Sequence, residues 1–239
     1  MRASEHLLIA LLLLGFPVYV AIAHRGFERA LRDGDAGARL RDYRRTMVAL
    51  WGMTLLALGL WWWRGGAWEV LGLTLPPGGR SLVGAALTLV LLGFLALQQR
   101  ALRHLGADGR EELGRRMGAV AEYLPRTPTE YRGFQALGIT AGLCEELLYR
   151  GFLLAYLEPF VGPWLAVVLG ALGFAAVHSY QGVAGVVRTG LIGLALGALY
   201  TGTGSLLWPV LIHAAVDLQA GAAGWALRGP SLATTASRP

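Results

Sequence analysis

The sequence predicts an all-α protein, a polytopic transmembrane bundle of about seven to eight helices with a cavity facing the cytoplasm. The composition supports this, because 55% of the 239 residues are hydrophobic and only 15% are charged, whereas soluble domains carry about 25% charged residues. The mean hydropathy is +0.50. Long apolar stretches alternate with short charged ones, which is the pattern of membrane helices and their connections.

Seven apolar stretches are the predicted membrane spans. A helix needs about 20 apolar residues, within a range of roughly 17–25, to cross a bilayer. The stretches are residues 7–23, 47–63, 81–98, 133–157, 163–178, 183–200 and 205–227. The fifth is the shortest and is marginal. Residues 68–75 are amphipathic and too short to cross, so we expect them to rest at the interface, before a turn at residues 76–79.

The charges predict the topology. All 21 basic residues are Arg, and seven of them lie in residues 24–46 and seven in 99–132. Cytoplasmic loops are enriched in positive charge, so both segments are expected to be cytoplasmic loops, with the N-terminus outside and the C-terminus inside. The composition, rich in Ala, Gly, Leu and Arg, suggests a bacterial inner membrane. No nucleic-acid motif accompanies the Arg residues, so lipid rather than nucleic acid is the expected partner.

Two features leave alternatives open. Residues 1–23 have an early Arg, an apolar core and an Ala-Ile-Ala end, which resembles a cleavable signal peptide. Cleavage would place the Arg-rich segment 24–46 outside, against the charge rule, so an uncleaved first span is favoured. Cys144 is the only cysteine, which excludes an intrachain disulfide, and its apolar setting favours a small core residue over a nucleophile.

The ionisable residues within the spans are the candidate functional residues. The first three spans have none in their interiors, whereas the last four carry several. A charged group at the bilayer centre costs about 2.5–3.5 kcal/mol on the insertion scale, so such groups need partners or a water-filled cavity and are functional candidates. They are Glu145, Glu146, Arg150, His178, Arg188, His213 and Asp217. Of these, Arg188 lies near a span end and is expected to extend to the surface.

In the fourth span, two adjacent carboxylates are expected to point in different directions around the helix. Glu146 and Arg150 are four residues apart, so they face each other on a helix and can neutralise each other. Glu145 points about 100° away around the helix and lacks that partner. We therefore expect Glu145 to face a cavity as a general base. The alternative is that all three residues form one buried ion-pair cluster.

Two imidazoles and a second acid complete the set. His178 ends the fifth span, and His213 and Asp217 share one face of the seventh. With Glu145 they can polarise a water and stabilise an oxyanion. They can equally ligate a divalent metal such as zinc. The sequence has no His-Glu-x-x-His motif and no Gly-x-Ser-x-Gly motif, so neither the common zinc-protease helix nor a serine nucleophile is expected.

Three motifs in order resemble those of the CPBP intramembrane proteases, also called the ABI family. The family includes the type II CAAX prenyl endopeptidases and bacteriocin-processing or immunity proteins. Glu145, Glu146 and Arg150 match its EExxxR motif, Phe174 and His178 its FxxxH motif, and His213 and Asp217 its HxxxN or HxxxD motif. The resemblance implies that Glu145 and His178 activate water and that His213 and Asp217 stabilise the oxyanion. It also implies a glutamate-type or a metal-dependent mechanism.

Asp217 departs from the Asn of eukaryotic members, and an ionised Asp cannot donate a hydrogen bond. It would have to be protonated, accept hydrogen bonds, or ligate a metal. The sequence thus divides into N-terminal spans and Arg-rich loops (1–132), a catalytic core (133–227) and a disordered tail (228–239). The leading hypothesis is an endopeptidase acting on a peptide or protein at the membrane. The rivals are a catalytically silent scaffold or immunity protein and a proton-coupled transporter.

Overall fold

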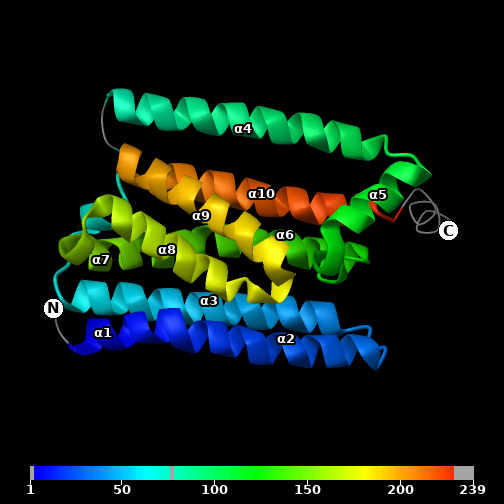
Figure 1. The fold of residues 1–239 in the computed structure, drawn as a ribbon, viewed down its shortest axis with the longest axis horizontal. Coiled ribbons are helices and arrows are strands. Elements are labelled where there is room, and N and C mark those ends of the chain that lie inside the picture. The colour runs from blue at the N-terminus through cyan, green and yellow to red at the C-terminus, as the bar shows by residue number, and fades with distance from the viewer. Residues whose placement is uncertain (1–2, 76–77, 229–239) are drawn as a thin grey trace.

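The computed structural model describes residues 3–75 and 78–228, and this part of the chain contains helices and no strand. Figure 1 shows the helices lying side by side, with α4 at one edge, the first helices at the opposite edge, and α6 to α10 between them. The predicted all-α bundle is confirmed. The expected turn at Pro76 and Pro77 and the tail after Arg228 lie outside the described residues.

The first helical run is longer than its predicted span. It consists of α1 (Ala3–Ala10), the π-helix η1 (Leu11–Gly15) and α2 (Phe16–Arg32), and α3 (Ala38–Trp63) then returns along it. The prediction of a loop over residues 24–46 is therefore wrong, since only a short turn separates α2 from α3. Arg, Ala, Leu and Glu are good helix formers. The helices therefore continue through the charged segment beyond their apolar residues.

Asp35 shapes the turn between α2 and α3. Its carboxylate accepts a hydrogen bond from the Gly37 amide at 2.9 Å and one from Arg41 at 3.2 Å. The Arg41 hydrogen bond, followed by the backbone bond from Gly37, lowers the pKa of the Asp35 carboxyl. This is an Asx-type turn, a common way to join two helices when the turn residue is Asp.

The second Arg-rich segment is also partly helical. After α4 (Gly79–Arg103), it forms α5 (Ala107–Met117) and the 3₁₀ helix η3 (Gly118–Glu122). Residues 68–75 contain only one short 3₁₀ helix, η2 (Trp68–Leu71). Leu71 of η2 is fully buried, and the Gly72 carbonyl accepts a hydrogen bond from the Leu206 amide at 2.9 Å. This segment is therefore tied to the start of the last helix.

The central helices carry the candidate residues. They are α6 (Pro128–Glu146), the π-helix η4 (Leu147–Leu153), α7 (Leu154–Val161), α8 (Pro163–Val177), the 3₁₀ helix η5 (Ser179–Gln181), α9 (Gly182–Thr203) and α10 (Leu207–Ala226). The fourth predicted span is thus not one continuous α-helix, because η4 interrupts it. Single π turns widen a helix locally and occur frequently at functional sites.

The start of α6 has a local cause that the predicted boundary at residue 133 overlooked. Thr127 and Glu130 form a capping box, in which the Thr127 hydroxyl accepts from the Glu130 amide at 3.1 Å and the Glu130 carboxylate accepts from the Thr127 amide at 3.0 Å. Pro128 occupies the first turn, where its missing N–H is tolerated. The Thr-x-x-Glu spacing is a known sequence signature of a helix start.

Close packing joins α6 to α10. A Cβ atom added to Gly142 would lie 2.7 Å from the Ala214 backbone nitrogen, and one added to Gly138 would lie 3.0 Å from the Asp217 Cβ. Small residues let membrane helices approach to backbone contact. These two glycines therefore place the helix that carries Glu145 directly against the helix that carries His213 and Asp217.

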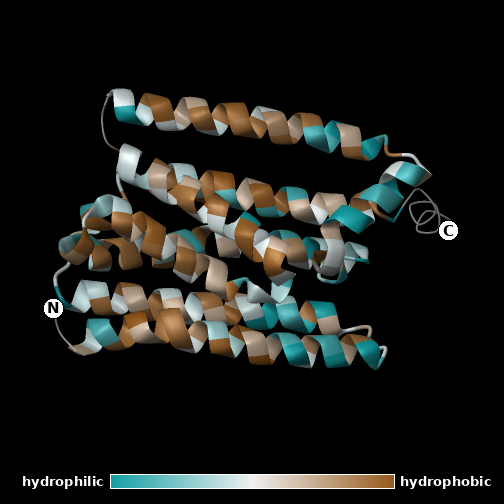
Figure 2. Ribbon diagram, viewed as in Figure 1, coloured by the Kyte–Doolittle hydropathy of each residue, from teal (hydrophilic) through white to brown (hydrophobic). Residues whose placement is uncertain are grey.

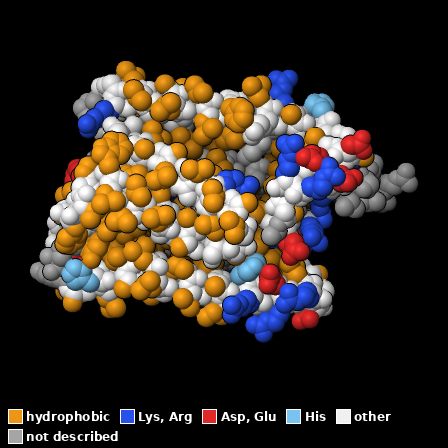
Figure 3. Space-filling view, in the orientation of Figure 1, with side chains coloured by type: hydrophobic (Ala, Val, Ile, Leu, Met, Phe, Trp, Pro, Cys, Tyr) orange, Lys and Arg blue, Asp and Glu red, His pale blue; other side chains and the backbone are white. Residues whose placement is uncertain are grey.

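The surface agrees with a multi-pass membrane protein. Among the described residues, four helical runs are long and apolar enough to cross a membrane: Ala3–Arg32, Ala38–Trp63, Gly79–Arg103 and Ser179–Thr203. Helix α8 is shorter, as expected for the marginal fifth span. Helices α6 and α10 are not among the four runs, and they carry the buried polar residues Glu145, Glu146 and His213. Figure 2 shows hydrophobic residues along most of the bundle, and Figure 3 shows charged side chains gathered at the end of the bundle that holds α5, the end of α2 and the start of α3.

The glycine contact predicts a measurable asymmetry between two Gly to Ala variants. Gly142→Ala should lower the free energy of unfolding by about 1–3 kcal/mol, the usual penalty for overpacking, because its Cβ would meet the α10 backbone. Gly52→Ala on α3 has no atom within 4 Å of the added Cβ and should leave stability unchanged or slightly raised. Thermal unfolding of both variants in detergent measures the difference, and equal midpoints would contradict the packing argument.

Candidate active site

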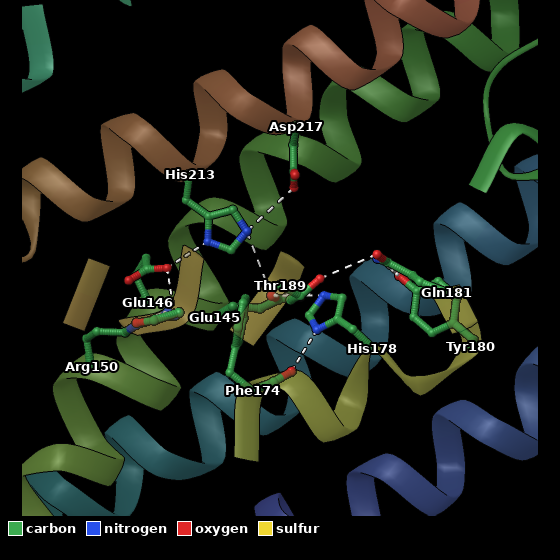
Figure 4. Close-up of polar contacts among 11 residues, drawn as sticks. Glu145, Glu146, Arg150, Phe174, His178, Tyr180, Gln181, Thr189, His213 and Asp217 are labelled. Atoms are coloured by element: carbon green, nitrogen blue, oxygen red, sulfur yellow. Dashed lines mark hydrogen bonds and ion pairs between the residues drawn. The ribbon is translucent and has the colours of Figure 1, made fainter. Parts of the chain in front are cut away.

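The four predicted site residues converge at the centre of the bundle (Figure 4). Glu145 lies one residue before the end of α6, and His178 directly follows α8. The Glu145 Oε2 atom is 4.0 Å from the His178 Nε2 and 3.9 Å from the His213 Nε2. On α10, the Asp217 Oδ2 lies 3.7 Å from the same His213 nitrogen. One carboxylate oxygen therefore faces two imidazole nitrogens at nearly equal distances.

Glu146 forms a buried polar network rather than a simple pair. Its Oε1 accepts hydrogen bonds from Arg150 Nη1 at 2.9 Å and from His213 Nδ1 at 2.7 Å. The Glu146 and Arg150 side chains are 0% and 3% exposed. The predicted ion pair between these two residues is confirmed. The bond from Glu146 to His213 was not predicted, because no local spacing relates residues that are 67 positions apart.

Phe174 supports the same cluster from α8. The Arg150 guanidinium carbon lies 4.4 Å from the centre of the Phe174 ring, a cation–π distance. The ring centre is 4.7 Å from that of His178 and 5.8 Å from that of His213. Arg150 also donates to the Gly193 carbonyl of α9 at 3.2 Å. Phe174 thus spaces the two imidazoles, while Arg150 links η4 to α9.

The hydrogen bonds select the form of each imidazole. His178 Nδ1 lies 2.8 Å from the Phe174 carbonyl oxygen, which can only accept, so Nδ1 carries the proton and the neutral ring presents a lone pair on Nε2. His213 Nδ1 likewise donates to the Glu146 carboxylate. The orientation of a His ring by the partner of its other nitrogen is a common feature of active sites. Both Nε2 atoms therefore point toward Glu145.

Glu145 differs from Glu146 in that no hydrogen bond to a described residue fixes its carboxylate, whereas Glu146 is held through Oε1. Its side chain is 12% exposed, and its Oε2 atom is buried without a hydrogen-bond partner among the described residues. A buried polar oxygen left unpaired costs about 1–3 kcal/mol, so the site calls for a small molecule or ion that bridges the groups around it. The adjacent Cys144 is fully buried in the core, as predicted.

The imidazoles and carboxylates of the site are of the kinds that bind a divalent metal, but the distances between their atoms are too long for one shared zinc ion. Two imidazole nitrogens and two carboxylates are ordinary zinc ligands, and two ligand atoms of one tetrahedral zinc, each about 2.0–2.1 Å from it, are about 3.4 Å apart. The distances from Glu145 Oε2 to the two imidazoles, 3.9 and 4.0 Å, are wider. Within residues 3–75 and 78–228, no three His, Cys, Asp or Glu side chains are spaced to hold a metal ion.

A cavity of about 210 Å³ connects the site with the charged end of the bundle. Glu145, His178, His213 and Asp217 line its inner part, and apolar side chains from α2, α3 and α6 line much of the rest. Near the Arg-rich ends of α2 and α3 it is bordered by His24, Asp42 and Arg45. Arg188 does not line this cavity and is exposed on α9.

Sequence reasoning missed the polar residues that the first two helical runs contribute. His24 follows the predicted first span directly, and Asp42 and Arg45 precede the second by a few residues. Because these helices extend beyond their apolar segments, the polar residues at their ends remain in register with the cavity. The proximity of ionisable residues to predicted span ends was the available signal.

A comparison with known protein families matches the segment that contains all four candidate site residues. Residues 129–219 match the family described as type II CAAX prenyl endopeptidase Rce1-like. This match supports membership of the CPBP family, on the evidence of that segment of the chain. The matched segment begins in the first turn of α6 and ends within α10, so it contains Glu145, His178, His213 and Asp217. A search of curated proteins and a search of solved structures each found no match.

At the family level, the match over residues 129–219 supports an intramembrane endopeptidase of the CAAX-protease type. The matched segment spans α6 to α10 and excludes the first helical runs. The helices α2 and α3, which form one wall of the cavity, therefore lie outside the matched segment. The matched segment contains the four candidate site residues and Tyr180, and the rest of the cavity lining comes largely from α2 and α3.

The buried network predicts that Arg150 is essential for stability. Arg150→Met should lower the free energy of unfolding by about 3–5 kcal/mol, the usual effect of leaving one member of a buried ion pair uncompensated, because Glu146 would keep only His213. Arg115 on α5 pairs with Glu112 at 3.0 Å and is 65% exposed, so Arg115→Met should have no measurable effect. Thermal unfolding in detergent compares the two, and similar midpoints would contradict the role assigned to Arg150.

Proposed function

We propose that this protein hydrolyses a peptide bond within or at the surface of the membrane, with a water molecule activated by Glu145. The observation that supports this most directly is the unpaired Glu145 Oε2, which faces His178 Nε2 at 4.0 Å and His213 Nε2 at 3.9 Å. One water can hydrogen-bond to two such atoms at once, since each of its bonds spans about 2.7–3.0 Å. The spacing suits a bridging water.

Glu145 and His178 have complementary tasks in the first step. The His178 lone pair on Nε2 accepts one hydrogen bond from the water and orients it, because Nδ1 is held by the Phe174 carbonyl. Glu145 removes the other proton as the water oxygen attacks the carbonyl carbon of the scissile bond. This is general base catalysis, which contributes typically 10²–10⁴-fold to the rate. The product of the step is a tetrahedral oxyanion and a protonated Glu145.

His213 is placed to stabilise the oxyanion. The Glu146 carboxylate, which accepts from His213 Nδ1 at 2.7 Å, favours the doubly protonated ring, whose Nε2–H then donates to the developing negative charge. Asp217 Oδ2, at 3.7 Å from the same Nε2, would favour the charged ring through an ion-pair contact rather than a hydrogen bond. In the second step the C–N bond breaks, and the proton held by Glu145 passes to the leaving nitrogen. The products are a carboxylic acid and an amine, and the acid then passes its proton to the amine.

The proposed setting is the inner membrane of a bacterium, with the charged end of the bundle in the cytoplasm and the N-terminus outside. The cavity reaches that charged end past Asp42 and Arg45, so the substrate would enter from the cytoplasmic side. Its apolar walls favour a peptide segment of a membrane-associated protein over a soluble polar ligand. Lipid surrounds the apolar outer surface.

The Glu145→Gln variant tests the mechanism. It keeps the size of the side chain and removes its ability to accept a proton, so hydrolysis should fall at least about 10²-fold while thermal unfolding stays unchanged. The probes are quenched CAAX-type peptides, one prenylated and one unmodified, with products identified by mass spectrometry. Glu111→Gln, on the exposed face of α5, serves as the matched control and should retain full activity.

An active Glu145→Gln variant would contradict the proposal. Loss of hydrolysis with no effect on a biological activity of the protein would instead favour a binding role for the same fold. Proton flux in proteoliposomes that is independent of hydrolysis would favour transport.

Metal dependence has a separate test. A zinc ion held by Glu145, His178, His213 and Asp217 would polarise a carbonyl and lower the pKa of bound water. Because the donor atoms are spaced more widely than zinc ligands, we expect hydrolysis to persist in 1,10-phenanthroline. Zinc in the purified protein should be substoichiometric by mass spectrometry. Loss of activity in the chelator and its recovery on adding zinc would assign the site to a metal.

A further inference from the structure

Three polar aromatic residues gather in the cavity next to the reacting groups, and the Tyr180 ring centre lies 5.9 Å from that of His178. They are His24 on α2, Tyr123 in the connection after η3, and Tyr180 in η5, and all three line the cavity. The centre of the Tyr123 ring lies 5.3 Å from that of His24 and 5.1 Å from that of Tyr180. Three segments far apart in the sequence therefore build one polar-aromatic cluster.

The cluster has hydrogen-bonding capacity that the protein does not use. The His24 Nδ1 and the Tyr123 hydroxyl are buried and have no hydrogen-bond partner among the described residues. Unpaired buried polar atoms are rare in proteins, and each one needs an explanation such as a bound ligand or water. Both atoms are screened from the solvent outside, and the cavity is the space that their side chains border.

Tyr180 adds a donor whose direction is set by its neighbours. The Thr189 hydroxyl donates to Gln181 Oε1 at 3.4 Å, and Gln181 Nε2 donates to the Tyr180 hydroxyl oxygen at 3.3 Å. Figure 4 shows this chain of contacts beside His178. Because the Tyr180 oxygen accepts from Gln181, its own proton is left for another acceptor. Hydrogen bonds in such chains strengthen one another.

The cluster also contains a defined acceptor. His24 Nε2 lies 3.2 Å from Glu28 Oε1, and a carboxylate can only accept, so the tautomer of the neutral ring that suits this contact has its proton on Nε2. In that tautomer Nδ1 presents a lone pair and can accept a hydrogen bond from a ligand. The three residues together provide one acceptor, His24, and two hydroxyl donors, Tyr123 and Tyr180.

This combination matches the backbone of an extended peptide. Each peptide unit carries one N–H donor and one C=O acceptor, and both must be paired when the chain enters an apolar cavity. We propose that His24, Tyr123 and Tyr180 form a substrate subsite that pairs with an N–H group and C=O groups of the bound peptide on the side of the scissile bond nearer the charged end. The inference deepens the proposed function and rests on it for the identity of the ligand.

The test separates binding from chemistry. Tyr123→Phe combined with Tyr180→Phe removes both hydroxyl groups and keeps the aromatic packing. Loss of two hydrogen bonds should raise KM for the quenched CAAX-type peptide about tenfold, with kcat changed less than about twofold. The matched control is Tyr131→Phe on α6, whose ring packs on Trp225 and does not line the cavity. This variant should leave both constants unchanged.

Changes in the peptide substrate test whether His24 Nδ1 accepts a hydrogen bond from it. Peptides in which one N–H at a time is replaced by an ester oxygen lose one donor each. At one position the wild-type protein should bind the ester more weakly than the amide, and His24→Phe should remove that preference. An unchanged KM in the double Phe variant, a loss confined to kcat, or no position at which the preference depends on His24 would each overturn the subsite.

Binding to the Glu145→Gln protein keeps the two proposals distinguishable. The Kd of the same peptide, measured by fluorescence anisotropy in that background, should rise about tenfold on adding the double Phe change. Weaker binding in a protein that does not cleave supports the subsite even if the chemistry differs from that proposed. Undiminished binding overturns the subsite and leaves the role of Glu145 intact.

Discussion

The structure of the site depends on the close contact between α6 and α10. At Gly142 and Gly138 the two helices approach until an added Cβ would collide with, or press against, the opposite helix. This approach brings Glu146 within 2.7 Å of His213 and Glu145 within 3.9 Å of the same ring. In lipid, helices gain little from burying apolar area against each other, so packing by small residues and interhelical hydrogen bonds must hold them together. Here both occur on the same pair of helices.

The buried charges are arranged so that Glu146 is held by two hydrogen bonds to its Oε1 atom, whereas no hydrogen bond to a described residue holds Glu145. Glu146 receives hydrogen bonds from Arg150 and His213, and Arg150 has further partners in Gly193 and Phe174. A network in which every member is paired can be stable inside a membrane protein, whereas one that loses a member becomes strongly destabilised. Glu145, one residue earlier, has no such partner. Adjacent residues on a helix point in different directions, and this difference separates structural support from proposed chemistry.

The cavity shows how a site can be shared between two parts of one chain. The inner groups come from the segment that matches the CPBP family, and the polar residues of the outer part come largely from α2, α3 and the connection before α6. The extended helices α2 and α3 carry His24, Asp42 and Arg45 beyond the apolar region. Under the proposed function, most of the groups placed for chemistry come from the matched segment, and His24 and Tyr123 of the proposed subsite come from outside it.

The sequence alone determined the features that depend on local spacing. Apolar length predicted the helices, because a bilayer requires about 20 such residues, and the i,i+4 spacing predicted the Glu146–Arg150 pair, because 3.6 residues per turn place these side chains together. The Thr127–Glu130 capping box could have been found in the same way. Helix ends in the Arg-rich segments were misjudged, since charged residues end an apolar stretch without ending a helix.

Only the tertiary structure decided which side chains meet. The bond between Glu146 and His213 joins residues 67 positions apart, and the cluster of His24, Tyr123 and Tyr180 joins three separate segments. Neither follows from helical periodicity, because it depends on how closely the helices pack and how far each extends. The sequence thus contained the candidate groups and their local orientation, and the helix packing set the distances on which any chemistry among them depends.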